Sequence, residues 1–183
     1  TAGNGTDEDV AVQGAKLTSI TVKSIGANSS FDDLDTGGIK TVTVDATKTL
    51  TVGELVTTAT KGTLNITGTG AVSLGVLDDG FTTLDASAAT GAVTMTGPGS
   101  SNLDAVITLG SGADKFTTGH GGFATNGDDL FAANAGSGRD TLIVADAAHV
   151  NTSDEAGRYT NFEILEYGAG SNANFDAQYL AST

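Results

Sequence analysis

Residues 41–74 read TVTVDATKTLTVGELVTTATKGTLNITGTGAVSL, and within this stretch polar residues, mostly threonine, alternate with valine, leucine and isoleucine. Period-2 alternation predicts strands with one buried face, because successive side chains of a strand point to opposite sides. The stretch contains four such segments, at Thr41–Asp45, Thr49–Gly53, Thr63–Thr67 and Ala71–Leu74. It therefore predicts short β-strands that follow one another at close intervals.

The same alternation recurs along most of the chain, which contains 29 threonines, 26 glycines and a single proline. Abundant threonine, valine and isoleucine favour strands, because β-branched side chains suit a pleated surface. Eight further segments show the pattern: Ser19–Lys23, Phe81–Asp85, Ala92–Thr96, Ala105–Leu109, Asp114–Thr117, Asp129–Ala132, Asp140–Val144 and Asn161–Tyr167. Turn-forming residues, mainly Gly, Asn, Asp and Ser, separate the segments, so the sequence predicts an all-β protein.

Evenly spaced short strands are typical of a β-sandwich, a barrel or a solenoid. Here the turns are glycine-rich and similar to one another, and the apolar residues of the strands are modest in size. In a parallel β-helix such strands stack rung upon rung, and each rung buries its inward residues against its neighbours. We therefore expect a right-handed parallel β-helix or β-roll solenoid, with a sandwich as the alternative.

The chain of 183 residues is long enough for one sizeable domain, and its formal net charge is −14. This excess of acids disfavours a nucleic acid or an anionic membrane surface as a partner, since both attract basic patches. The absence of cysteine excludes a zinc site built on thiolates. No apolar run approaches the roughly 18 residues that a membrane span needs. The acids therefore serve either solubility or the binding of cations.

Three short pieces share the pattern G-x-G-x-D-x-U-x, where U is a large apolar residue. They are GSGADKFT at 110–117, the front-shortened GDDLFA at 127–132 and GSGRDTLI at 136–143. Glycine allows a tight turn with inward carbonyls, and aspartate adds a carboxylate to the oxygen shell that calcium prefers. The apolar residue of each piece, which is Phe116, Phe131 or Leu142, is expected to begin a strand and to point into the core.

This pattern resembles the nonapeptide G-G-x-G-x-D-x-U-x of the repeats-in-toxin (RTX) family. The resemblance implies calcium ions held between the turns of neighbouring coils on one side of a β-roll. It assigns carboxylate ligands to Asp114, Asp129 and Asp140, and further side-chain oxygens to Asn126 and Asp128. It assigns backbone carbonyl ligands to Gly110, Gly112, Gly127, Gly136 and Gly138.

The three pieces depart from the family pattern in ways that affect the expected number of ions. Leu109 and Ala135 replace the first glycine in the first and third pieces, and an insertion at 118–125 separates the first two. In the family, equivalent turns stack about every eighteen residues. Asp114 and Asp140 are 26 residues apart, which is one such coil plus eight. We therefore expect one to three calcium ions rather than a continuous row.

A second resemblance, covering about residues 40–170, is to the repeats of bacterial surface-layer (S-layer) proteins and large type I-secreted adhesins. It rests on FTTLDASAATGAVT at 81–94, with a G-x-G-x-D turn after it, and on YTNFEIL at 159–165. The resemblance implies a calcium-binding structural or assembly module of a secreted, extracellular bacterial surface protein, whose folding is coupled to calcium. Self-association or a cell-surface glycan are the further partners that it implies.

The sequence offers few residues for catalysis, and we expect no enzymatic activity. The two histidines, His120 and His149, are 29 residues apart, and neither has a second histidine at a metal-ligand spacing. There is no G-x-S-x-G elbow and no phosphate-binding glycine loop. Two alternatives to an assembly module stay open: a glycan-binding adhesin module, and a module of a polysaccharide-active β-helix enzyme.

The expected organisation along the chain has four parts, without a clear linker between them. Residues 1–15 form a tail or a first rung, and residues 16–108 form degenerate solenoid rungs. Residues 109–145 contain the RTX-like turns, and residues 146–183 form terminal rungs or a cap.

Overall fold

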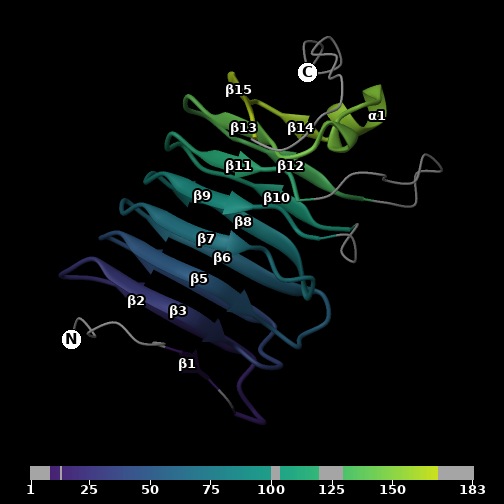
Figure 1. Ribbon diagram of the computed structural model, residues 1–183. Coiled ribbons are helices and arrows are strands. Elements are labelled where there is room, and N and C mark those ends of the chain that lie inside the picture. Colours follow the sequence, from purple (N-terminus) through teal and green to yellow (C-terminus); the bar gives the residue numbers. More distant parts are fainter. Residues whose placement is uncertain (1–8, 13, 100–103, 120–129, 169–183) are drawn as a thin grey trace.

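The computed structural model describes residues 9–12, 14–99, 104–119 and 130–168, and it shows a parallel β-solenoid (Figure 1). The chain coils repeatedly, and each coil adds one strand to each of two sheets. The paired strands are parallel throughout the described residues. The predicted all-β, parallel solenoid fold is therefore confirmed.

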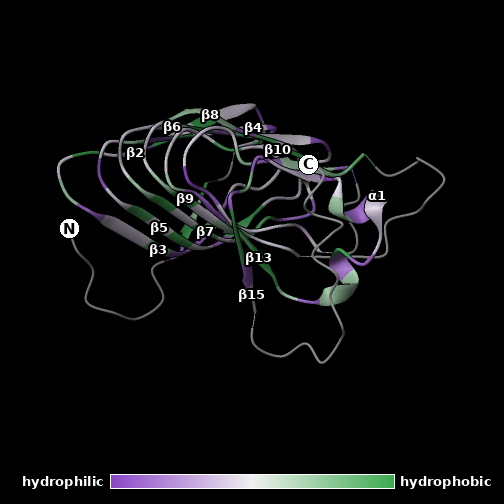
Figure 2. Ribbon diagram, turned by 90° about the horizontal axis from the view of Figure 1, so that it is seen from above, coloured by the Kyte–Doolittle hydropathy of each residue, from purple (hydrophilic) through white to green (hydrophobic). Residues whose placement is uncertain are grey.

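The two sheets divide the strands by odd and even number. Sheet A contains β1 (Val10–Ala11), β3 (Ser29–Asp35), β5 (Leu50–Val56), β7 (Val72–Val76), β9 (Val93–Thr96), β11 (Lys115–Thr117), β13 (Thr141–Val144) and β15 (Ile164–Tyr167). Sheet B contains β2 (Ser19–Ser24), β4 (Thr41–Ala46), β6 (Gly62–Gly68), β8 (Phe81–Ala89), β10 (Val106–Thr108), β12 (Ala132–Asn134) and β14 (Tyr159–Thr160). Figure 2, which looks along the stack, shows the two sheets on opposite sides of the solenoid.

Helical structure in the described residues is confined to the connection between β13 and β14. It consists of the 3₁₀ turn η1 (Ala147–His149) and the short helix α1 (Ser153–Ala156). The Thr152 side chain caps α1 by accepting a hydrogen bond from the Glu155 N–H at 3.2 Å. Among the described residues, no helix is long and apolar enough to cross a membrane.

Successive coils of this solenoid are longer than those of an ideal RTX roll. Leu64 pairs with Leu84, 20 positions later, and Lys115 pairs with Thr141, 26 positions later. Asp114 and Asp140, which precede this last pair, therefore lie one coil apart and stack directly. The predicted offset of eight residues between them was wrong, because it assumed a coil of about eighteen residues.

The core consists of files of side chains that run along the solenoid. In sheet B, one file is in register from β4 to β14, and each of its members is at most 1% exposed: Val42, Leu64, Leu84, Ile107, Ala133 and Tyr159. Burying an aliphatic side chain of this size contributes roughly 1.5–3 kcal/mol. The three apolar residues of the Gly-Asp pieces are buried as predicted, with Phe116 and Leu142 in sheet A and Phe131 beside β12 in sheet B.

Candidate functional site

The turns that lead from sheet B to sheet A bring four of the predicted site residues together. Gly136 stacks on Gly110, and Gly138 stacks on Gly112, one coil apart. A Cβ atom added at Gly138 would overlap the carbonyl oxygen of Gly112, and one added at Gly112 would lie 2.7 Å from the backbone of Gly91. Gly138 also has a positive φ of 148°. These glycines are therefore required because successive turns approach one another at backbone distance.

The stacked turns form hydrogen bonds with each other through their backbones. The Ser137 N–H donates to the Gly110 carbonyl at 3.0 Å, and the Ser111 N–H donates to the Ala89 carbonyl, also at 3.0 Å. The Gly136 N–H donates to the Asn134 side chain at 2.9 Å. The Gly110 carbonyl, which the sequence predicted as a calcium ligand, thus has a hydrogen-bond partner within the fold.

A file of three carboxylates begins where each of these turns enters sheet A. Leu50, Val72 and Val93 stack in register at this position in the earlier coils. In the next three coils the position is taken by Asp114, Asp140 and Glu163. Each of these acids accepts a hydrogen bond, at 2.7 Å, from the N–H of the residue one coil before it: Val93, Asp114 and Asp140, respectively.

The structure thus brings two predicted ligands, Asp114 and Asp140, into one file and adds Glu163, which the sequence analysis did not assign. A signal for Glu163 was present, because the segment NFE enters β15 as the Gly-Asp pieces enter β11 and β13. Its side chain is exposed at the end of the file, whereas Asp114 and Asp140 are 0% exposed. We call Asp114, Asp140 and Glu163 the acid file.

The two buried members of the acid file differ in how their second oxygen is satisfied. Asp114 Oδ2 accepts a hydrogen bond from the Gly110 N–H at 3.1 Å, so both of its oxygens have a partner. Asp140 Oδ2 is buried and has no hydrogen-bond partner within the described residues. A buried polar atom without a partner costs about 1–3 kcal/mol, and more when it is charged. Asp140 is therefore the member of the acid file whose buried carboxylate oxygen lacks a compensating partner.

Burial also changes the acidity of the file. Desolvation raises the pKa of Asp114, although the N–H groups of Val93 and Gly110 act in the opposite direction. Desolvation likewise raises the pKa of Asp140, and the neighbouring charges of Asp114 and Glu163 raise it further against the hydrogen bond from the Asp114 N–H. Both carboxylates thus resist being charged more than an exposed aspartate does.

The fit of a cation differs between the two aspartates. Asp140 offers a buried carboxylate oxygen that lacks a partner, which is the kind of ligand that calcium prefers. Asp114 offers no such oxygen, since both are engaged by backbone N–H groups. The described residues contain no cluster of three or more His, Cys, Asp or Glu side chains that could surround one ion. Within the described residues, Asp140 therefore keeps one carboxylate oxygen without a hydrogen-bond partner, whereas Asp114 does not.

The remaining predicted ligands, Asn126, Gly127, Asp128 and Asp129, lie outside the described residues. The apolar residue of their piece, Phe131, lies next to β12 of sheet B. The first and third pieces instead lead into β11 and β13 of sheet A. The second piece therefore enters the opposite sheet from the other two.

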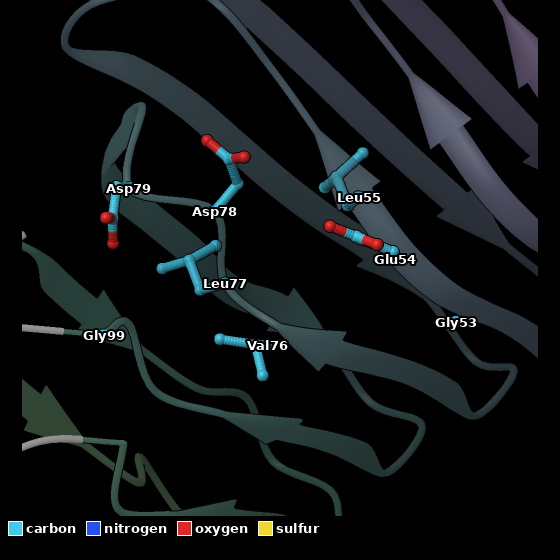
Figure 3. Close-up of a pocket in the computed structure, with 8 residues that line it drawn as sticks. All are labelled: Gly53, Glu54, Leu55, Val76, Leu77, Asp78, Asp79 and Gly99. Atoms are coloured by element: carbon cyan, nitrogen blue, oxygen red, sulfur yellow. The ribbon is translucent and has the colours of Figure 1, made fainter.

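A separate acidic feature is a pocket of about 500 Å³ near the ends of β5 and β7 (Figure 3). Glu54, Asp78 and Asp79 line it together with the exposed side chain of Val76. Asp78 accepts a hydrogen bond from the Gly80 N–H within its own turn at 2.8 Å. Figure 3 shows the three carboxylates spread around the pocket and not gathered at one point.

His149 lies close to the buried hydroxyl of Thr118. The Thr118 Oγ1 is 2.8 Å from His149 Nδ1 and also accepts a hydrogen bond from the Ala145 N–H at 3.0 Å. Thr118 is only 1% exposed, so its hydroxyl is not open to a substrate. The pair joins the end of β11 to the segment after β13, which is a structural role.

Comparisons with known proteins give no match from which a function could be assigned. No protein-family model matches this chain. Neither a curated protein nor a solved structure matches it.

Proposed function

We propose that this chain is a non-enzymatic structural module of a secreted bacterial surface protein, and that calcium stabilises its fold through Asp140. The observation that carries the proposal is the buried Asp140 Oδ2, which has no partner within the described residues. The resemblance of the Gly-Asp turns to RTX repeats supports calcium as the cation. The S-layer-like repeats support the role as a surface module.

The residue type changes from aliphatic to acidic along one file of stacked positions. Leu50, Val72 and Val93 gain stability at this position by leaving water. Asp114 and Asp140 occupy the equivalent position as buried acids whose charges oppose one another. Burial of a charge is unfavourable unless a partner compensates it. A divalent cation would supply that compensation at Asp140, and its binding free energy would then become folding free energy.

Stabilisation by calcium suits a protein that folds after export. Extracellular calcium modules bind with dissociation constants on the order of 10⁻⁴ to 10⁻³ M. At low calcium the acid file lacks its counter-charge, and the glycine-rich turns keep their chain entropy. At higher calcium the ligands of neighbouring coils, among them Asp140 and the turn carbonyls, would be held together. Folding would thus follow the calcium concentration.

One feature of the end of the solenoid supports a role in assembly. β15 is the last described strand of sheet A, and it exposes Leu165 and Tyr167 to 42% and 41%. Within the described residues, only one edge of β15 is paired, through β13. An unpaired strand edge with apolar side chains is suited to pairing with a further strand.

The proposal is tested by thermal unfolding, followed by circular dichroism, with calcium and with chelator. Calcium at about 100 times its dissociation constant would stabilise the fold by about 2.7 kcal/mol. For a chain of this size that corresponds to a rise in Tm of roughly 5–10 °C. The Asp78→Asn variant, altered in a solvated turn, is the matched control and should respond as the wild type does. A Tm that does not change between chelator and millimolar calcium would contradict the proposal.

A further inference from the structure

The outward side of sheet B carries a regular array of hydroxyl-bearing side chains. In β2, β4, β6 and β8, pairs of outward residues stack in register: Ser19 and Thr21, Thr41 and Thr43, Thr63 and Asn65, and Thr83 and Asp85. The inward residues between them are buried, as Val42, Leu64 and Leu84 show. We call these eight outward residues the hydroxyl face. The irregularities of the β6–β8 pairing lie outside the two pairs that belong to it.

The hydroxyl groups of this face are not used by the fold. Within the described part of the chain, the Ser and Thr side chains of the hydroxyl face make no hydrogen bond. Threonine is also stiff at χ1, so its hydroxyl and methyl groups hold nearly fixed positions on a strand. A pre-organised array loses little entropy when it binds a partner with the same spacing.

The charge of the face restricts the partner. The whole chain has a net charge of −14, yet the hydroxyl face has one charged member, Asp85. At its margin, Lys23 and Asp45 neutralise each other with an N–O distance of 3.3 Å. Acids of sheet A, such as Asp33 and Glu54, lie on the opposite side of the solenoid. A hydrogen-bonding face with a single charge, in an otherwise acidic protein, matches an uncharged, hydrogen-bonding partner.

The spacing of the array points to ordered water. Neighbouring strands are about 4.8 Å apart, and alternate residues of a parallel strand are about 6.6 Å apart. In a tetrahedral water lattice with O–O distances of about 2.75 Å, second neighbours lie about 4.5 Å apart, and the axial repeat is about 7.3 Å. The mismatch across the strands is about 0.3 Å per strand, so it accumulates to only about 1 Å over four strands. Along a strand only two positions are involved, so the mismatch does not accumulate.

We propose that the hydroxyl face binds the surface of ice. Two other partners fit the observations less well. Binding of sugar rings usually relies on aromatic side chains, and the hydroxyl face contains none. A second copy packed face to face would bury apolar side chains between the sheets, whereas this face presents polar ones. Binding of ordered water requires neither aromatic rings nor an apolar face. It needs only fixed hydroxyl and methyl groups at repeating intervals.

The experiment measures thermal hysteresis of the purified chain in calcium and the uptake of fluorescently labelled protein into a growing ice crystal. The wild type should be taken up and should separate the freezing and melting points. Thr63→Tyr places a bulky ring in the middle of the hydroxyl face and should abolish both effects. Thr51→Tyr, at an exposed position of β5 in sheet A, is the matched control and should retain them. Melting temperatures establish that each variant is folded.

A gain-of-function variant makes the test independent of any loss of folding. Asp85→Thr replaces the one charge of the face with the residue that the array repeats, so hysteresis should increase. The proposal is overturned if the folded wild type is excluded from ice and shows no hysteresis, or if Thr63→Tyr and Thr51→Tyr behave alike. It is also overturned if the wild type binds microcrystalline cellulose or chitin through this face, with loss in Thr63→Tyr, but has no effect on ice.

Discussion

At the scale of single residues, Asp140 is the position where chemistry and packing conflict. Its backbone belongs to a regular stack, and its Oδ1 accepts the Asp114 N–H, but its Oδ2 is buried without a partner in the described residues. An aliphatic residue, as at Val93 in the same file, has no such conflict. The sequence pattern identified Asp114 and Asp140 as a related pair. It could not distinguish the two aspartates, because they differ in whether a backbone N–H reaches the Oδ2 atom. For Asp114 that donor is the N–H of Gly110.

The raised pKa values of Asp114 and Asp140 predict a dependence of stability on pH in chelator. A pKa raised in the folded state means that the folded protein binds these protons more tightly than the unfolded chain does. The stabilising contribution is therefore complete below the unfolded pKa of about 3.9 and is lost as the pH rises through the folded pKa values. We expect the wild type to lose stability with rising pH relative to the double variant Asp114→Asn/Asp140→Asn.

The measurement is the difference in Tm between the two proteins from about pH 4 to neutrality. Asp85, whose pKa is lowered by its hydrogen bonds to Ser87, contributes in the opposite sense but is present in both proteins and cancels. A difference in Tm that stays constant over this range would show that the two buried carboxyls do not control the pH response.

At the scale of elements, the strands were predicted more completely than the turns. Alternation located β4 and β6 within a residue or two, because their inward residues are uniformly aliphatic. It missed β3, which reads SSFDDLD, because two successive acids interrupt the alternation between Phe31 and Leu34. The turns were correctly found to be glycine-rich. Their stacking could not be predicted, since it depends on coil lengths that vary from 19 to 26 residues.

Stacking of the turns predicts a graded response to alanine at three glycines. Gly138→Ala should be the most destabilising, because the new Cβ meets the Gly112 carbonyl and the φ is positive. Overpacking of this kind costs about 1–3 kcal/mol in addition to the cost of the φ angle. Gly26→Ala has a positive φ but open space, so it should cost only about 1–2 kcal/mol. Gly38→Ala meets neither obstacle and should be nearly neutral.

Urea unfolding in calcium measures the three free energies. Equal losses for Gly138→Ala and Gly26→Ala would show that backbone conformation alone, and not contact between successive coils, demands the glycines of these turns.

At the scale of the whole molecule, the solenoid separates two surfaces with different chemistry. The two buried members of the acid file, Asp114 and Asp140, lie inside, at the junction between the turns and sheet A, while the hydroxyl face lies outside, on sheet B. The all-β solenoid could be predicted from the sequence because its signal repeats in every coil. The site was predicted only in part: Asp114 and Asp140 stack as a pair, Glu163 was not foreseen, and residues 126–129 lie outside the described residues. Calcium, secretion and assembly stay predictions.

If a buried, uncompensated charge at Asp140 links the fold to calcium, the Asp140→Asn variant should remove that link. The neutral amide can still accept the hydrogen bond from the Asp114 N–H, so the stacking of the two residues is kept. The measurement is the Tm of the wild type and of the variant, each with chelator and with calcium. We predict that the variant is more stable than the wild type in chelator by on the order of 1 kcal/mol. We also predict that calcium no longer raises its Tm. A variant that is less stable than the wild type in chelator and still gains stability from calcium would show that Asp140 does not couple folding to calcium.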